Sequence, residues 1–153
     1  MITPNLSPAV KTVRLKVDGT NWTLAAGTTN VNSDVVDMAG FDGIRFVIGF
    51  GTITSGAATS IKVQQGQVSN LSDAADLAGS AITVADTDDN KMAISEIFRP
   101  QERYVRLSTL RATQNAVVDF LIAELYSMHK KPITQDTTVI SAELFNSPAE
   151  GTA

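Results

Sequence analysis

Short runs of alternating apolar and polar residues, separated by turn-forming residues, occupy most of positions 10–145 of this chain. Near the start of this region, Val13, Leu15 and Val17 alternate with charged residues. A period of two residues is that of a half-buried β-strand, because successive side chains of a strand point to opposite faces. Gly, Pro, Asn and Asp gather between the runs, as they do in turns. The pattern therefore predicts a chain built mainly from short β-strands.

The other strands follow from the same alternation. Residues 44–50 are almost all apolar, which is typical of a central strand covered on both faces. Residues 103–110 and 116–126 are predicted to pair as a hairpin. A helix over 115–128 is the alternative, but the β-branched residues in that run favour a strand. The full set of predicted strands is 10–17, 22–24, 35–38, 44–50, 59–65, 81–85, 92–98, 103–110, 116–128 and 139–145.

One segment departs from the strand pattern. Ser72 is a suitable helix N-cap, Asp73 would lie in the first turn, and Gly79 suits a helix end with positive φ. The sequence therefore predicts one or two turns of helix over residues 72–79. Many short strands at this spacing predict an all-β sandwich or barrel. A two-sheet antiparallel sandwich of jelly-roll type, with one short helix, is the preferred fold.

Three regions differ in composition. Residues 1–9 carry two prolines and little periodicity, which predicts an extended N-terminal arm. Residues 10–131 form the predicted β-sandwich domain. Residues 132–153 are a predicted C-terminal extension, which begins near Pro132 and ends in small and polar residues.

The charge balance and the lack of long apolar runs limit the partners. The chain has 12 Lys and Arg against 16 Asp and Glu, a net charge of −4. This balance argues against nucleic-acid binding, because the phosphate backbone attracts clustered cations. No apolar run approaches the roughly 18–20 residues of a membrane span, and the N-terminus does not resemble a secretory signal. We therefore expect no nucleic-acid partner and no membrane partner.

The acidic and imidazole side chains match no catalytic or metal-binding motif. An EF-hand counted from Asp86 would need Gly and an acid at its sixth and twelfth positions, where the chain has Lys91 and Ile97. The acidic stretch 86–90 is better interpreted as a solvated turn. His129 has no nucleophile or orienting acid near it in the sequence, so an exposed position is predicted.

Carboxylate pairs can hydrolyse glycosides when they face each other across a sugar-binding cleft. Asp119 and Glu124 are an odd number of residues apart and would face opposite sides of a regular strand. A sugar cleft also needs an aromatic platform, and the chain has one Trp and two Tyr. With no cysteine there is no thiolate nucleophile. We predict that the chain is not an enzyme, and we assign it no catalytic residue, metal or cofactor.

Four arginines fall in and around one predicted hairpin, namely Arg99, Arg103, Arg106 and Arg111. They could bind phosphate or carboxylate groups. Pairing with Glu96, Glu102 or a neighbouring subunit is the simpler interpretation. Because arginine is enriched at the centres of protein interfaces, Arg103 and Arg106 are predicted interface residues.

Several stretches are similar to small structural proteins of tailed bacteriophages that are often encoded near the major capsid protein. These stretches are 33–46, which includes Val35-Val36-Asp37-Met38, then 73–79, 99–106 and the tail 147–153. The resemblance implies a capsid decoration, or cement, protein with a jelly-roll fold. It further implies assembly in the host cytoplasm, a place on the exterior of the virion capsid, and the major capsid protein as partner. No functional residue is carried over from the family.

The resemblance leads to a hypothesis for the two terminal regions. The sandwich would form a dimer or trimer on the shell, with both arms lying along capsid neighbours. Extended arms can add strands to exposed sheet edges. Anchor residues are expected at Pro4, Leu6 and Pro8 in the N-terminal arm, and at Ile140, Leu144 and Phe145 in the C-terminal extension. In the alternative interpretation, residues 139–145 are simply the last strand of the core.

Other functions stay open at this point. A phage tail or baseplate component has the same composition as a cement protein. A carbohydrate-binding β-sandwich would need calcium or an aromatic platform, and the aromatic content of 6% argues against it. A hydrolase is disfavoured by the motifs considered above.

Overall fold

The computed structural model describes residues 5–145 and 149–152, and all the regular structure in that part of the chain is β-strand. The predicted all-β fold is therefore confirmed. The ten strands are β1 (Lys11–Arg14), β2 (Val31–Asn32), β3 (Val36–Asp37), β4 (Phe41–Ile53), β5 (Ala58–Gly66), β6 (Ala75–Asp76), β7 (Ile82–Val84), β8 (Met92–Phe98), β9 (Tyr104–Ala112) and β10 (Ala116–Met128).

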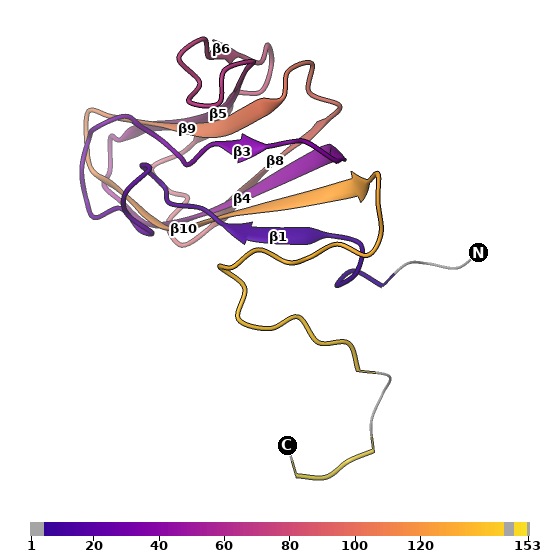
Figure 1. Cartoon of the computed structure of the whole chain (residues 1–153). Helices are drawn as coiled ribbons and strands as arrows, with labels where there is room; N and C mark the ends of the chain where they lie inside the picture. Colours follow the sequence, from indigo (N-terminus) through magenta and orange to yellow (C-terminus); the bar gives the residue numbers. More distant parts are fainter. Residues whose placement is uncertain (1–4, 146–148, 153) are drawn as a thin grey trace.

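The strands form two antiparallel sheets that pack as layers (Figure 1). Sheet A has the order β1-β10-β4-β8. In sheet B, β9 and β5 lie at the centre, β2 and β3 pair with the outer side of β9, and β6 and β7 pair with β5. The predicted two-sheet sandwich is therefore confirmed.

The pairing order is that of a jelly roll. β1 pairs with β10, β2 and β3 pair with β9, β4 pairs with β8, and β5 pairs with β6 and β7. These pairs are nested, as in one long hairpin whose tip lies between β5 and β7. Rolling that hairpin up brings β10 beside β4 and β9 beside β5. The nested order supports the jelly-roll prediction, because a jelly roll is this kind of double-sheet wrap.

The core lies between the sheets and follows the alternation of the sequence. In β4, Ile44, Phe46 and Ile48 are completely buried. Val63 of β5 and Leu107 of β9 face them from sheet B. Truncating a buried aromatic such as Phe46 to Ala typically costs about 3–5 kcal/mol.

The predicted helix over residues 72–79 is wrong. The carboxylate of Asp73 accepts hydrogen bonds from the preceding backbone N–H groups of Gln67 (2.8 Å) and Val68 (3.2 Å). The Asp73 side chain thus stabilises the loop that precedes it in the sequence and does not cap a helix that follows it. Ala75 and Asp76 then pair with β5 as the short strand β6. Gly79 does take the predicted positive φ, at 77°.

The strand interpretation of 116–128 is correct, and the alternative helix is wrong, because β10 pairs along its length with β4. The predicted hairpin of 103–110 with 116–126 is wrong, because β9 belongs to sheet B and β10 to sheet A. Residues 22–24 contribute only an isolated bridge between Leu24 and Val118. Residues 139–145 form no strand, so they are not the last strand of the core. They belong to an extended segment that leaves the body of the molecule (Figure 1).

The described part of the N-terminal arm is not fully extended, contrary to the prediction. The backbone N–H groups of Ala9 and Val10 both donate to the carbonyl of Leu6, each at 2.8 Å. These bonds close a turn immediately before β1. Residues 1–4 lie outside the part of the chain that the structure describes.

Candidate interaction surface

The outer face of sheet A carries apolar side chains in register across neighbouring strands. One row runs Ile122, Val47, Ile94 across β10, β4 and β8. The next row on one side runs Phe120, Gly49, Met92. On the other side of the first row lies a charged row, Glu124, Arg45, Glu96, and after it a row formed by Tyr126, Gly43 and Phe98. The sheet A outer face is defined here by Val47, Met92, Ile94, Phe98, Phe120, Ile122 and Tyr126.

The apolar side chains of β8 are the most exposed members of this face. Met92 is 64% exposed, Phe98 57% and Ile94 46%. Single exposed apolar residues are common, but a contiguous apolar patch marks an interaction site or an aggregation hazard. Five members of the sheet A outer face form such a patch because they are neighbours in the strand register, namely Val47, Met92, Ile94, Phe120 and Ile122. Phe98 and Tyr126 lie beyond the charged row.

Two glycines of β4 shape this surface. A Cβ at Gly43 would overlap the ring of Tyr126, and a Cβ at Gly49 would overlap the ring of Phe120. The missing side chains let both rings lie flat across β4. Over Gly43, Tyr126 meets Phe98 of β8 in a stacked pair with ring centroids 6.4 Å apart. The result is a smooth aromatic and aliphatic surface.

A charged row crosses the middle of the face. Arg45 Nη1 donates to Glu124 Oε2 at 2.8 Å, and Glu96 of β8 is the register neighbour of Arg45 on its other side. Burial, together with the nearby Glu96 carboxylate, raises the pKa of Tyr126 to about 12. This row adds polar contacts to a surface that is otherwise apolar.

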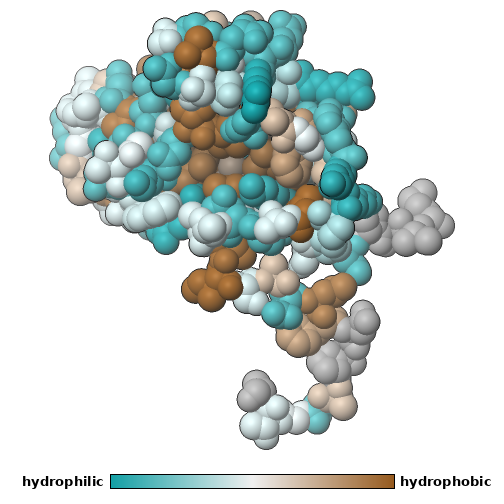
Figure 2. Space-filling view, viewed as in Figure 1, coloured by the Kyte–Doolittle hydropathy of each residue, from teal (hydrophilic) through white to brown (hydrophobic). Residues whose placement is uncertain are grey.

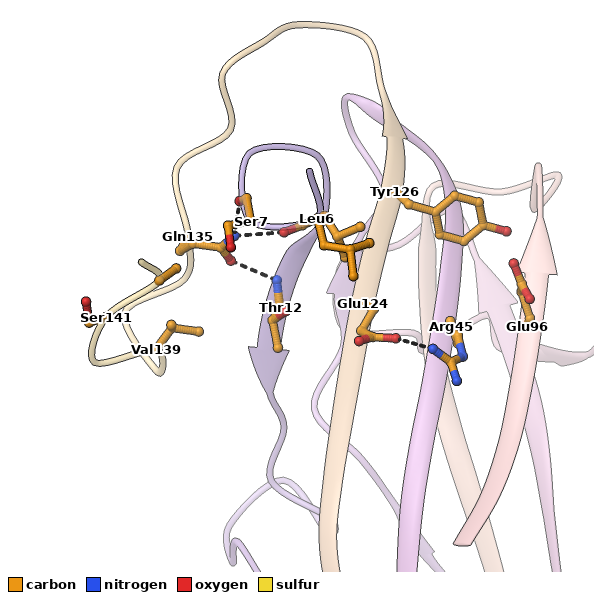
Figure 3. A pocket seen from close by; sticks show the side chains of 12 residues that line it. Leu6, Ser7, Thr12, Arg45, Glu96, Glu124, Tyr126, Gln135, Val139 and Ser141 are labelled. Carbon is orange, nitrogen blue, oxygen red and sulfur yellow. Dashed lines mark hydrogen bonds and ion pairs between the residues drawn. The ribbon is translucent and has the colours of Figure 1, made fainter. Parts of the chain in front are cut away.

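The terminal segments make a wall at the β1 side of the face, and a groove of about 450 Å³ lies beside it. Figure 3 shows Leu6 over β10, the Arg45–Glu124 pair on the groove floor and Glu96 on the far strand. Residues of the C-terminal segment complete the lining, among them Val139, Ser141 and Ala142. The groove is therefore built from five separate parts of the sequence.

Gln135 holds the two terminal segments together. Its Oε1 accepts from the Thr12 backbone N–H at 2.9 Å, and its Nε2 donates to the carbonyls of Ser7 (2.9 Å) and Val10 (2.7 Å) (Figure 3). Three backbone groups of the N-terminal region thus depend on one amide side chain. The wall of the groove is fixed by these bonds.

The outer face of sheet B is different in character. Lys62 Nζ pairs with Asp76 at 2.6 Å, and Gln64 donates to the same carboxylate at 2.7 Å. Arg106 Nε donates to Gln64 at 2.8 Å. This face is polar, and its side chains satisfy one another. The two outer faces of the sandwich are therefore chemically unlike.

The predicted interface residues fall on both sides of the molecule. Arg103 and Arg106 lie on sheet B, where Arg103 forms a two-bond pair with Asp37 at 2.8 and 2.7 Å. Hydrogen bonding to Arg103 lowers the pKa of the Asp37 carboxyl. Pairing of these arginines with Glu96 or Glu102 was wrong, because the strand register places Asp37 and Gln64 beside them.

The terminal anchors lie on the other side. Leu6 lines the groove and Pro8 is exposed beside it, whereas Pro4 lies outside the described residues. Ile140, Leu144 and Phe145 are all exposed on the C-terminal segment. Figure 2 shows brown, apolar residues along this segment below the body. The structure thus brings the two terminal segments together but separates them from the arginines.

The remaining predicted features have structural partners. In the acidic turn, Asp86 accepts from the Gly56 N–H at 2.6 Å and Asp89 from the Ile53 N–H at 2.5 Å. His129 is exposed, as predicted, and lies 2.8 Å from Asp42. No group of three metal-ligating side chains is found within residues 5–145 and 149–152.

The predicted orientation of Asp119 and Glu124 is wrong. The register of β10 against β4 shifts by one residue between Val118 and Phe120, which is a β-bulge. Asp119 is the extra residue, and its carboxylate lies near Gly51 on the outer side of sheet A. Both acids therefore lie on the same face, because the bulge interrupts the strict alternation.

The apolar residues of the sheet A outer face were not identified from the sequence. One signal was available in β8, where three of the four even-numbered positions are apolar (Met92, Ile94 and Phe98) and the odd-numbered Ile97 is apolar as well. A strand that is apolar on both faces is either buried or part of an interface. The sequence alone does not distinguish a buried strand from an interface strand, because the difference depends on which strands lie beside β8.

Comparisons with known proteins add no relative. A scan of the sequence against protein-family models finds no match. A search of curated proteins finds no significantly similar sequence. Within the part of the chain that the structure describes, no helix is long and apolar enough to cross a membrane.

Proposed function

We propose that this chain is a capsid decoration, or cement, protein of a tailed bacteriophage that binds the major capsid protein shell through the sheet A outer face. The observation that carries the proposal is the contrast between the two faces of one sandwich. Sheet A presents apolar side chains that are neighbours across its strands, with a groove beside them. Sheet B presents polar side chains that hydrogen bond and ion pair with one another. A protein that lies on a shell needs one face of each kind.

The energetics suit a binding role. Burying apolar surface stabilises a contact by roughly 25 cal/mol per Å² before the costs of association. The aromatic and aliphatic members of the patch lie on paired strands, so binding does not have to order their backbone, and the entropy cost is confined to exposed side chains such as Met92. A protein that binds only the assembled shell stabilises that shell by mass action. Cementing then requires no chemistry from the bound protein.

Two further observations support the proposal. The resemblance to phage structural proteins, itself a prediction from the sequence, rests in part on stretches 33–46 and 99–106, which contain β3 and the first residues of β4 and β9. The jelly-roll order is used by viral capsid proteins, although it also occurs in lectins and cupins. Since a fold does not determine a function, the interaction face carries more weight than the topology.

Binding to shells tests the proposal. Purified protein is sedimented with shells of the major capsid protein that lack it, and the loaded shells are then heated. We expect saturable binding and a higher melting temperature of the loaded shells. Folded protein that stays in the supernatant at all concentrations would contradict the cement function. In that case, binding to isolated tails would support a tail or baseplate component.

A further inference from the structure

The four edges of the two sheets are not equally protected. The edges of sheet B are formed by β2, β3, β6 and β7, each of two or three residues. Very short edge strands are one way in which proteins prevent edge-to-edge pairing. In sheet A the edges are β1 and β8, and these two strands differ in how their free backbone groups are used.

The β1 edge is closed by side chains. The pairing of β1 with β10 leaves the N–H groups of Thr12, Arg14 and Lys16 on the outer side. These donate in turn to Gln135 Oε1 (2.9 Å), Thr138 Oγ1 (2.9 Å) and Asp34 Oδ2 (3.0 Å). Three successive donors on this edge are therefore satisfied, and no strand can add there without breaking these bonds.

The β8 edge is open. Hydrogen bonds from Phe50 N to Lys91 O (2.9 Å) and from Arg99 N to Asp42 O (2.6 Å) fix the odd-numbered residues of β8 as the partners of β4. By alternation, the backbone groups of Met92, Ile94, Glu96 and Phe98 point away from the sheet. Within the described part of the chain, no acceptor is found for these four N–H groups.

The open edge is also long and apolar. β8 has seven residues, against two or three in each edge strand of sheet B. Three of the four residues with free backbone groups are the exposed Met92, Ile94 and Phe98. An exposed, apolar edge strand is a template for pairing with another chain. The closed β1 edge shows that the same sheet is protected on its other side.

A second segment of the chain has the complementary property. The C-terminal segment is held against β1 through Gln135 and Thr138. Beyond that point Val139 is half-buried, residues 140–145 are exposed, and none of them forms a strand. The apolar side chains of Ile140, Leu144 and Phe145 are exposed and do not line the groove, whereas Val139, Ser141 and Ala142 do. An anchored base followed by an exposed stretch with unburied apolar side chains is the arrangement that strand addition requires.

This stretch cannot pair with β8 of its own chain. It starts outside β1, so a path to the far side of β8 crosses five inter-strand spacings, or about 24 Å at roughly 4.8 Å each. Residues 139–145, fully extended, span about 23 Å at roughly 3.3 Å per residue. The crossing would use the whole stretch and leave none of it to form a strand. Any such pairing must therefore be between two molecules.

We propose that residues 139–145 of one molecule add as an antiparallel strand to the open β8 edge of a second copy of this chain. The register that aligns apolar residues places Ile140 beside Phe98 and Leu144 beside Ile94. The small Ala142 then lies beside Glu96. Reciprocal exchange between two copies closes a two-fold dimer, in which sheet A gains a fifth strand in each molecule.

The inner side of the added strand also finds suitable surroundings. In the same register, Phe145 lies beside Ala93 and points toward a hollow of about 240 Å³ lined by Phe50, Ile82 and Val84. Glu143 lies beside Ser95, in a wider hollow that also includes Ser80 and Arg99. The Phe145 ring thus meets a mostly apolar hollow. The wider hollow has a mixed lining, in which Arg99 is the cation and Asp76 and Glu96 are the acids.

Disulfide trapping tests the pairing directly, because the chain has no cysteine of its own. Ile94→Cys and Leu144→Cys proteins are mixed under mild oxidation, with the full chain in each. Directly opposed residues of an antiparallel pair have Cα atoms about 5.5 Å apart, which a disulfide can bridge. We expect the mixed 94–144 dimer to exceed either homodimer severalfold. Val68→Cys, at another exposed apolar position, replaces Ile94→Cys in the matched control. Its mixture with Leu144→Cys should show no preference for the mixed dimer.

Each other outcome overturns the proposal. A predominance of 94–94 dimers would mean that two β8 edges pair with each other. A statistical mixture, in which the mixed dimer is only twice as abundant as either homodimer and the Val68→Cys control behaves alike, would mean random collision. Ultracentrifugation of the unmodified protein adds a second reading: we expect a dimer that Ile94→Lys and Leu144→Lys each convert to monomer, while Val68→Lys does not. A wild-type monomer at high micromolar concentration would also contradict the exchange.

This inference goes beyond the proposed function and is tested without shells. A dimer of this kind that fails to bind shells would refute only the cement function. A monomer that binds shells would refute only the strand exchange. If both hold, each dimer carries two sheet A faces, and linked binding sites gain avidity from their effective concentration.

Discussion

At the scale of single residues, Arg111 has the most consequential environment. Its guanidinium lies in the interior and donates to the carbonyls of Ala25 (2.9 Å), Thr29 (3.0 Å) and Ala116 (2.8 Å). Asn30 accepts from its backbone N–H at 2.8 Å. The side chain therefore ties the long connection between β1 and β2 to the start of β10. It is a structural residue and is not available to a partner.

Replacing this side chain tests that role. We expect Arg111→Met to lower the free energy of unfolding by about 3 kcal/mol, because three carbonyls lose a charged donor in a buried site. Urea denaturation followed by circular dichroism measures the change. Arg106→Met, on the polar outer face of sheet B, is the control and should cost less than about 1 kcal/mol. Equal costs for the two variants would show that the internal bonds do not stabilise the fold.

Tyr126 gives a pH-dependent expectation. Its pKa is raised from 10.0 to about 12, chiefly by burial and then by Glu96. The folded state therefore favours the protonated phenol. Its contribution to stability is fully present below pH 10 and is lost as the pH rises toward 12.

Comparing wild type with Tyr126→Phe isolates this contribution. We expect the stability of the wild type to fall more steeply between pH 10 and 12 than that of the variant. Thermal melts across this range measure both. Parallel curves would mean that the phenol titrates alike in the folded and unfolded states.

Sequence reasoning was weakest at this scale. It placed Arg111 in one group with Arg103 and Arg106, because residue type and spacing were all it could use. The partners of Arg111 are backbone carbonyls, which every residue carries, so no sequence signal distinguishes a buried arginine from an exposed one. The exposed position of His129 was predicted correctly, because its neighbours are lysines.

At the scale of elements, the two edges of sheet A differ in whether a further strand can pair with them. Side chains of Gln135, Thr138 and Asp34 accept from the outer N–H groups of the β1 edge, whereas the β8 edge has no comparable side chain within the described residues. Gln135 and Thr138 come from a segment with no regular structure. This segment therefore contributes to the fold even though it lies outside the strands.

Removing the Gln135 side chain should expose the β1 edge. We expect Gln135→Ala to speed hydrogen exchange at the Thr12 amide and to cost about 1.5–4.5 kcal/mol of stability, since three bonds are lost and each contributes about 0.5–1.5 kcal/mol. Exchange monitored by NMR measures the first effect. Gln114→Ala, at an exposed turn position, should leave the Thr12 amide unchanged. Unchanged exchange in the Gln135 variant would show that this edge is protected in another way.

Sequence reasoning did well on the long strands and poorly on the short segments. The alternation in β4, β5, β9 and β10 predicted their type and approximate limits, because one face of each is buried. The segment 72–79 satisfied helix capping rules, yet Asp73 bonds backward to Gln67 and β5 offers a pairing partner. Residues 139–145 alternate like a strand, but they have no partner within one molecule. Local patterns cannot reveal the presence or absence of a partner strand.

At the scale of the whole molecule, the jelly roll separates an apolar outer face from a polar one. The sandwich could be predicted from strand number and spacing, but the pairing order could not. The apolar face depends on that order, because Ile122, Val47 and Ile94 come from three strands far apart in the sequence. For the same reason sequence reasoning missed this apolar surface, and the terminal anchors that it named stay predictions.

The measurement that most directly tests the central claim compares the two faces in shell binding. Ile122→Lys places a charge in the middle of the sheet A outer face, and Leu110→Lys makes the same change on the outer side of sheet B. Both proteins are first shown to fold and are then sedimented with shells that lack the protein. We expect the affinity of Ile122→Lys for the shell to fall by tenfold or more, the equivalent of about 1.4 kcal/mol, with Leu110→Lys close to wild type. Loss of binding only in Leu110→Lys, or in neither variant, would contradict the claim that sheet A binds the shell.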